Sequence, residues 1–170
     1  MLAQKARWLV DFRISKAMTK RERSALKGAL AGLIGGLAGA GAKLVAEEIF
    51  PPRTLGQTPA SVLLAEQVAG HPLAPGKKQI AHKSIHWAFG AVAGAVYGAA
   101  VEYEPSLGAW RGAAFGIALN KMTHESLLPK MGLAAATEWQ PPRERISEWV
   151  SHAVYGVVTD AVRRAARRAL

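Results

Sequence analysis

The sequence contains no cysteine, which excludes disulfide bonds, thiolate metal sites and cysteine nucleophiles. It also lacks a phosphate-binding P-loop, a G-x-S-x-G nucleophile motif and a dinucleotide-binding glycine motif. No cleavable signal peptide is expected, because the N-terminal segment has no uninterrupted apolar run beside a small-residue cleavage site. We therefore expect no enzyme activity and no cofactor, and insertion into a membrane would use uncleaved helices.

Composition alone does not separate a membrane protein from a soluble one. The chain has 170 residues, which fits one domain. Hydrophobic residues make up 50% of the chain and charged residues 20%, and the mean hydropathy is only +0.07. That hydropathy is low for a membrane protein and average for a soluble one, so the order of residues along the chain has to decide.

The net charge of +10 is concentrated at the two ends of the chain. Residues 1–27 combine many basic residues with the apolar residues Trp8, Leu9, Phe12 and Ile14. This pattern is typical of an amphipathic helix on an anionic lipid surface, with a solvated basic helix as the alternative. Residues 165–170 form a basic C-terminal tail. Because basic flanks suit a membrane protein, nucleic acid is not an expected partner.

Four apolar segments follow, and a helix is expected in each. They are residues 28–50, 85–103, 107–128 and 146–163. Pro51 and Pro52 end the first segment, and a turn at 104–106 separates the second from the third. Charged residues interrupt the third and fourth segments, so neither is the run of about 20 mostly apolar residues that a span requires. The prediction that all four cross a bilayer therefore depends on their glycines.

Glycine recurs at every fourth position in three of these segments. The first row starts at Gly28. The predicted packing positions in the three rows are Gly32 and Gly36, then Gly90, Gly94 and Gly98, and then Gly108, Gly112 and Gly116. In water a glycine inside a helix costs about 1 kcal/mol relative to alanine, whereas in lipid such rows let helix backbones pack closely. We therefore predict an all-α fold, an integral membrane four-helix bundle packed through glycine ladders. A water-soluble bundle rich in glycine and alanine is the alternative.

The distribution of lysine and arginine predicts the topology. Basic residues favour the cytoplasmic side of a span, so both termini are expected in the cytoplasm, and an even number of spans satisfies this. Residues 51–84 and 129–145 then become periplasmic loops of a transmembrane domain covering 28–164, with a short helix expected at 61–68.

Polar residues gather in the periplasmic half of the predicted spans, while the other half is mostly glycine, alanine, valine and leucine. They are Lys43, Glu47, His86, Asn120, His124, Glu125, Glu148, His152 and Tyr155. Such groups at membrane depth usually face the bundle interior or a water-filled cavity. Three interpretations stay open. The residues cap and pair at helix ends, or they form a proton-responsive or ion-conducting site, or they bind a metal ion through His86, His124, His152 and Glu148.

Several motifs occur in the order seen in a known family. KLVAEEIFPPRT at 43–54, HESLLPKMGL at 124–133 and SEWVSHAVYG at 147–156 resemble the YagU-like inner-membrane proteins. The resemblance implies a bacterial inner-membrane protein with four helices, from a family without an established activity. We expect a non-enzymatic small subunit of a larger membrane assembly or a self-associating bundle. The expected partners are the lipid bilayer and a membrane protein or second copy of the chain.

Overall fold

The computed structural model describes residues 23–53 and 56–170. The α-helices are α2 (Ala25–Ile49), α3 (Ala60–Ala69), α4 (Pro75–Tyr103), α5 (Ala113–Met122), α6 (Leu128–Lys130) and α7 (Pro142–Ala169). Shorter helical turns are η1 (Pro105–Gly112), η2 (Thr123–Leu127) and η3 (Thr137–Trp139). No strand occurs in the described ranges, so the all-helical prediction is confirmed. The amphipathic helix predicted for residues 1–27 lies, up to residue 22, outside these ranges.

Local sequence sets the ends of the long helices. The Ser24 hydroxyl accepts a hydrogen bond from the backbone N–H of Lys27 at 3.3 Å and so caps α2. Two prolines follow α2 and cannot continue it. Prolines open α4 and α7, where the missing N–H costs no helical hydrogen bond. Consequently α4 begins at residue 75 rather than 85, and α7 begins at residue 142 rather than 146. At its other end α7 continues to Ala169, so it includes most of the segment predicted as a tail.

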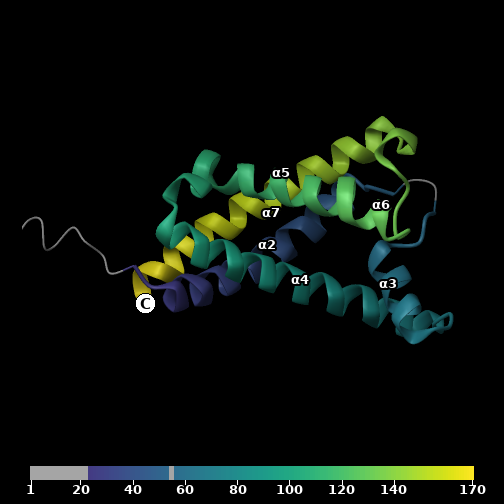
Figure 1. Cartoon of the computed structure of the whole chain (residues 1–170), viewed down its shortest axis with the longest axis horizontal. Helices are drawn as coiled ribbons and strands as arrows, with labels where there is room; N and C mark the ends of the chain where they lie inside the picture. Colours follow the sequence, from purple (N-terminus) through teal and green to yellow (C-terminus); the bar gives the residue numbers. More distant parts are fainter. Residues whose placement is uncertain (1–22, 54–55) are drawn as a thin grey trace, which may run out of the picture.

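Helix α2 lies between α4 and α7, and α5 packs on the other side of α7 (Figure 1). The Lys27 ammonium donates a hydrogen bond to the backbone carbonyl of Leu170 at 2.7 Å. The start of α2 and the end of α7 therefore meet at one end of the molecule, whereas α3 and α6 lie at the opposite end. The short helix expected at 61–68 corresponds to α3.

Helices α2 and α4 approach each other along glycines. A Cβ on Gly32 would overlap the carbonyl oxygen of Gly94 and lie 2.9 Å from the Cα of Gly98. A Cβ on Gly36 would meet the carbonyl oxygen of Gly90 in the same way. A side chain of any size at these positions would push the two backbones apart.

Glycines also line the contacts of α7. Gly39 of α2 faces the Thr159 hydroxyl, and a Cβ on Gly116 would overlap the carbonyl oxygen of His152. Gly108 differs from the prediction, because a Cβ there would meet only the Tyr97 hydroxyl, at 3.8 Å. It follows that Gly108 is not a close-packing position.

The third predicted helix is broken. Trp110 and Arg111 have left-handed backbone angles, with φ of 51° and 54°, and Gly112 follows with φ of 88°. This turn redirects the chain so that Gly112 comes against the backbone of Gly156 on α7. The prediction of one helix over 107–128 is therefore wrong, and η1, α5, η2 and α6 occupy this range instead.

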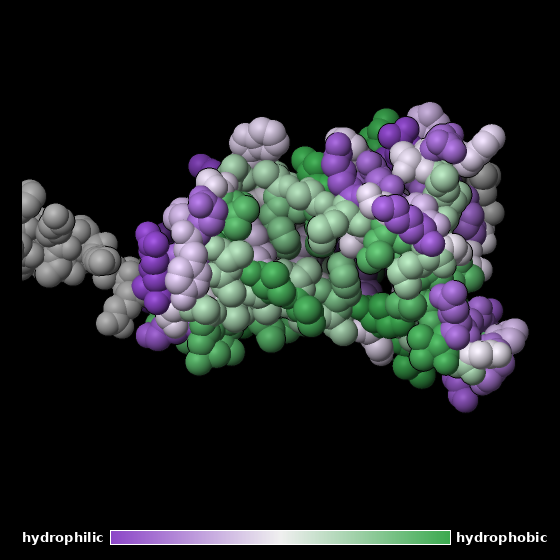
Figure 2. Space-filling model, viewed as in Figure 1, coloured by the Kyte–Doolittle hydropathy of each residue, from purple (hydrophilic) through white to green (hydrophobic). Residues whose placement is uncertain are grey.

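Two helices, α2 and α4, are long and apolar enough to cross a membrane. At 1.5 Å per residue they extend roughly 37 and 43 Å. Only 39% and 22% of their most apolar windows are buried inside the protein, whereas the core helix of a soluble protein is mostly buried. Exposed aliphatic side chains such as Ile34, Val92 and Val96 form much of this surface, and Figure 2 shows hydrophobic surface between more polar ends. This surface suits association with a membrane.

Candidate functional site

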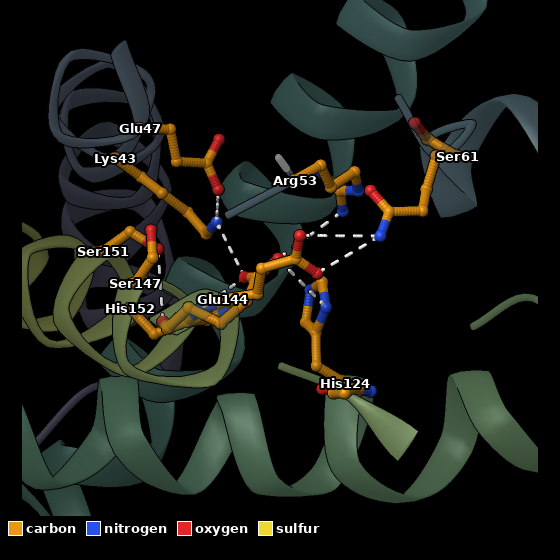
Figure 3. Close-up of polar contacts among 12 residues, drawn as sticks. Lys43, Glu47, Arg53, Ser61, His124, Glu144, Ser147, Ser151 and His152 are labelled. Carbon is orange, nitrogen blue, oxygen red and sulfur yellow. Dashed lines mark hydrogen bonds and ion pairs between the residues drawn. The ribbon is translucent and has the colours of Figure 1, made fainter. Parts of the chain in front are cut away.

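Charged and histidine side chains gather inside the bundle near α3 and α6 (Figure 3). We call this group the Glu148 cluster, and it consists of Lys43 and Glu47 from α2, Arg53 from the following loop, His124 from η2, and Glu148 and His152 from α7. Five of these six residues were predicted as site residues from the sequence. The fold brings them together from four separate parts of the chain.

The Glu148 carboxylate is the centre of the cluster. Its oxygens lie 3.5 Å from the Lys43 ammonium and 3.5 Å from the Arg53 guanidinium. The Nδ1 atoms of His124 and His152 lie 3.6 and 3.5 Å from it. Because Glu148 is only 8% exposed, its charge requires such partners.

Permanent charges in the cluster balance. Lys43 also forms an ion pair with Glu47, one turn along α2. Lys43 and Arg53 therefore offset Glu47 and Glu148, and the two histidines need no proton to complete the balance. This leaves the imidazole rings available as neutral ligands.

His152 is oriented by the backbone of its own helix. Its Nδ1 atom lies 2.7 Å from the carbonyl oxygen of Glu148, and the residue is 3% exposed. When Nδ1 donates this hydrogen bond, Nε2 carries the lone pair. Metal-binding histidines are typically oriented by such a bond to a backbone carbonyl.

Three residues of the cluster can bind one ion together. One ligand atom from each of His124, Glu148 and His152 lies within 4.8 Å of the other two. The rings of His124 and His152 meet edge to face, with centroids 4.9 Å apart. His86, which the sequence included in the metal set, has its Nε2 atom 3.1 Å from the carbonyl oxygen of Ala40 and is not in this group. Two imidazoles and a carboxylate suit zinc, with one coordination position left open.

The other predicted residues lie around the cluster rather than in it. The Tyr155 hydroxyl donates to the carbonyl oxygen of Gly90 at 2.7 Å. The Glu125 carboxylate accepts a hydrogen bond from the Trp149 indole. Asn120 is 1% exposed, and neither atom of its amide group has a hydrogen-bond partner among the described residues.

Two cavities adjoin the cluster. The larger, of about 300 Å³, is bordered by Lys43, His86, His152 and Tyr155 and by apolar side chains of α3, α4 and the α5–α6 segment. The smaller, of about 100 Å³, is bordered by Arg53, His124, Glu144 and Glu148. Both cavities therefore leave open space beside residues of the cluster.

The sequence analysis did not identify Arg53 as a site residue. Arg53 lies in the loop after α2, directly after Pro51 and Pro52. The sequence analysis also missed a second polar group in the second half of α7, where Asp160 is fully buried. Asp160 accepts hydrogen bonds from the Tyr97 hydroxyl at 3.0 Å and from Arg163 at 2.8 Å. The spacing of Asp160 and Arg163 on one helix was the available signal. The half expected to hold mostly small apolar residues thus contains a buried ion pair.

Comparison with known protein families places the chain in a family. Searches of curated proteins and of solved structures found no significant match. Residues 37–161 match the model of a family described as DUF1440, a protein of unknown function. This range contains every residue of the Glu148 cluster and most of the chain. The chain therefore belongs to the DUF1440 family of proteins of unknown function.

Proposed function

We propose that the chain is a non-enzymatic inner-membrane protein, related to YagU-like proteins, that crosses the bilayer four times with both ends in the cytoplasm. The two apolar helices α2 and α4, and the contact between the start of α2 and the end of the chain at Leu170, support this. Helix α7 turns polar residues such as Ser151 and Thr159 inward, while Val150 is 47% exposed. Such a helix crosses lipid only when other helices cover its polar face.

We further propose that the protein binds a divalent transition metal ion of the zinc class. The observation that carries this proposal is the grouping of His124, Glu148 and His152 within 4.8 Å. A tetrahedral zinc site has ligand atoms roughly 3.4 Å apart, given metal–ligand distances of about 2.0–2.1 Å. The ligand atoms therefore need to approach one another by up to about 1.4 Å, which we expect side-chain rotations to supply.

Lys43 and Arg53 make a specific contribution to this proposal. Both lie 3.5 Å from the Glu148 carboxylate and compete electrostatically with a bound cation. Removing one of these charges should strengthen metal binding, provided that the fold is kept. A site built only of helix-end ion pairs would not respond in this way.

The larger cavity favours a binding site over a conducting path. Its innermost border includes Ala40, Gly90 and Tyr155. Beyond this border a Cβ on Gly94 would lie only 2.5 Å from the Cα of Gly36. The proposed ion therefore enters and leaves at one end of the bundle. A stable membrane-protein partner or second copy stays a prediction.

Zinc titration of the purified protein tests the proposal. The full chain in mild detergent, stripped with a chelator, should bind near-stoichiometric zinc by calorimetry and elemental analysis. His152→Ala should weaken binding by about 100-fold or more, the scale on which ligand shells control affinity. His86→Ala is the matched control, because His86 lies outside the ligand group, and should bind normally.

Arg53→Gln supplies the independent readout. We expect zinc to bind several-fold more tightly to this variant, because a competing positive charge is removed. Absence of stoichiometric zinc in the wild-type protein would contradict the proposal. An equal loss in His86→Ala and His152→Ala would also contradict it.

A further inference from the structure

Helices α4 and α5 separate toward the end of the bundle that holds α3 and α6 (Figure 1). Helix α4 packs on α2 and α5 packs on α7, while α4 and α5 hardly touch each other. Near the other end, Tyr97 of α4 stacks on Phe115 of α5 with ring centroids 4.1 Å apart. The space between the two helices is the larger cavity. Figure 2 shows a hollow between hydrophobic surfaces on the side of the molecule.

The cavity has apolar walls and a polar region on the α2 side. Its walls include Ile85 and Phe89 from α4 and Leu119, Leu127, Leu128 and Met131 from the segment opposite. Phe89 and Leu127 are 48% and 51% exposed, so both also belong to the outer surface of the bundle. In the proposed membrane orientation, this side of the molecule faces lipid chains.

The cluster as a whole is balanced in charge, but its charges are divided unequally between the two cavities. Lys43 and Arg53 border the larger cavity, and Glu47 is the one carboxylate among the described residues that line it. The Glu148 carboxylate borders the smaller cavity, and its contacts with Lys43 and Arg53, at 3.5 Å, exceed the roughly 2.7–2.9 Å of a charge-assisted hydrogen bond. An ammonium has three donors and a guanidinium five. Lys43 uses one donor on Glu47, and both cations keep further donors for an incoming carboxylate.

We propose that this cavity binds the carboxylate end of a single-chain amphiphile, such as a fatty acid, that enters from the bilayer between α4 and α5. The volume of about 300 Å³ is at the lower limit of small-ligand pockets. It accommodates one head group with the start of one chain, whereas a two-chain lipid requires more room. The inference goes beyond metal binding and does not depend on it, because the chelated protein keeps the same cavity.

Photo-crosslinking in liposomes tests this inference. The full chain is reconstituted with a chelator present and exposed to a palmitate analogue that carries a photoreactive group near its carboxylate. Peptide mapping should place the crosslinks in residues 85–90 and 119–131. Excess palmitate should abolish them, whereas excess hexadecanol, which has the same chain without the charge, should not.

Two pairs of variants sharpen the test. Leu64→Trp on α3 adds bulk to the cavity lining and should suppress the crosslinks, whereas Val68→Trp, one turn away and 82% exposed, should not. Arg53→Gln should reduce palmitate-sensitive crosslinking up to about fivefold, the value of one partly exposed ion pair. Arg143→Gln is its control, because Arg143 is exposed and lies outside the cavity lining.

The outcomes separate this inference from the metal proposal. Arg53→Gln should weaken binding of the amphiphile and strengthen binding of zinc, so the two affinities change in opposite directions. Crosslinks spread evenly over the lipid-facing side of α4, without competition by palmitate, would overturn the inference. Competition by a single-chain phosphate lipid but not by palmitate would overturn the choice of a carboxylate.

Discussion

Asn120 is buried on α5 with no hydrogen-bond partner for its amide group among the described residues. An orphaned buried polar group costs about 1–3 kcal/mol. We expect Asn120→Ala to stabilise the chelated protein by about 1 kcal/mol, measured by thermal unfolding in detergent. Thr123→Ala is the contrasting variant and should destabilise, because the Thr123 hydroxyl donates to the carbonyl oxygen of Leu119 at 2.8 Å. A loss of stability in Asn120→Ala would mean that this amide has a bound partner.

Positions along the predicted helices were enough to select most residues of the Glu148 cluster. His124, Glu148 and His152 stand at corresponding depths of two predicted spans, and the structure groups them. The neighbours His124 and Glu125 could not be distinguished from the sequence, because the π-helical turn η2 determines which of them faces Glu148. Arg53 was missed because its place depends on the path of a loop rather than on a helical period.

At the scale of the helices, Gly32 is the clearest test of the contact between α2 and α4. Gly32→Ala should destabilise by about 1–3 kcal/mol, because its Cβ would overlap the backbone of Gly94. Gly76→Ala is the matched control, since no atom of the described residues lies within 4 Å of a Cβ there. Unfolding of both variants in the same detergent gives the comparison. Equal stability of the two would show that the helices are not in close contact at Gly32.

The stability of the corner between α3 and α4 should depend on pH. The Glu66 carboxylate accepts a hydrogen bond from the backbone N–H of Leu73 at 2.9 Å and pairs with Lys78 at 3.0 Å. Together with the nearby His71, these groups favour the charged carboxylate and lower the pKa of Glu66 below 4.5. Because the pKa of Glu66 is lower in the folded chain than in the unfolded one, its charged form stabilises the corner at pH values above the ordinary pKa of a glutamate. This stability is lost as the pH falls through the lowered pKa of the folded state.

Hydrogen exchange of residues 70–78, corrected for intrinsic rates, measures this effect. Protection should be higher near pH 6 than at about pH 3. Glu66→Gln should show the low protection at both values. A pH difference that persists in this variant would assign the effect to another group.

Some helix ends were easier to predict than helix continuity. The first helix was predicted to stop at Pro51 and Pro52, and α2 ends just before them, whereas α4 begins at Pro75 rather than at the predicted residue 85. The break at Trp110 and Arg111 was not predicted, because neither residue favours a left-handed backbone. The close approach of Gly112 to α7 accompanies this turn, and such a tertiary contact leaves no local signal.

At the scale of the whole molecule, the absence of cysteine makes the topology directly testable. His71→Cys, between α3 and α4, should react with a membrane-impermeant maleimide added to intact spheroplasts. Leu170→Cys should react only after the membrane is permeabilised, because four crossings return the C-terminus to the cytoplasm. Labelling of both positions in intact spheroplasts would contradict the proposed topology.

The stack of Tyr97 and Phe115 lies away from the open end of the larger cavity, where α4 and α5 are furthest apart. If α4 and α5 tilt relative to each other about this stack, the distance between them changes more with increasing distance from the rings. Widening of the cavity should therefore be least at the rings and greatest beside α3 and α6. There η2 replaces ordinary α-helical geometry, which gives α5 a natural place to bend. In the proposed bilayer orientation, the stacked rings and the open end of the cavity would therefore lie at different depths of the membrane.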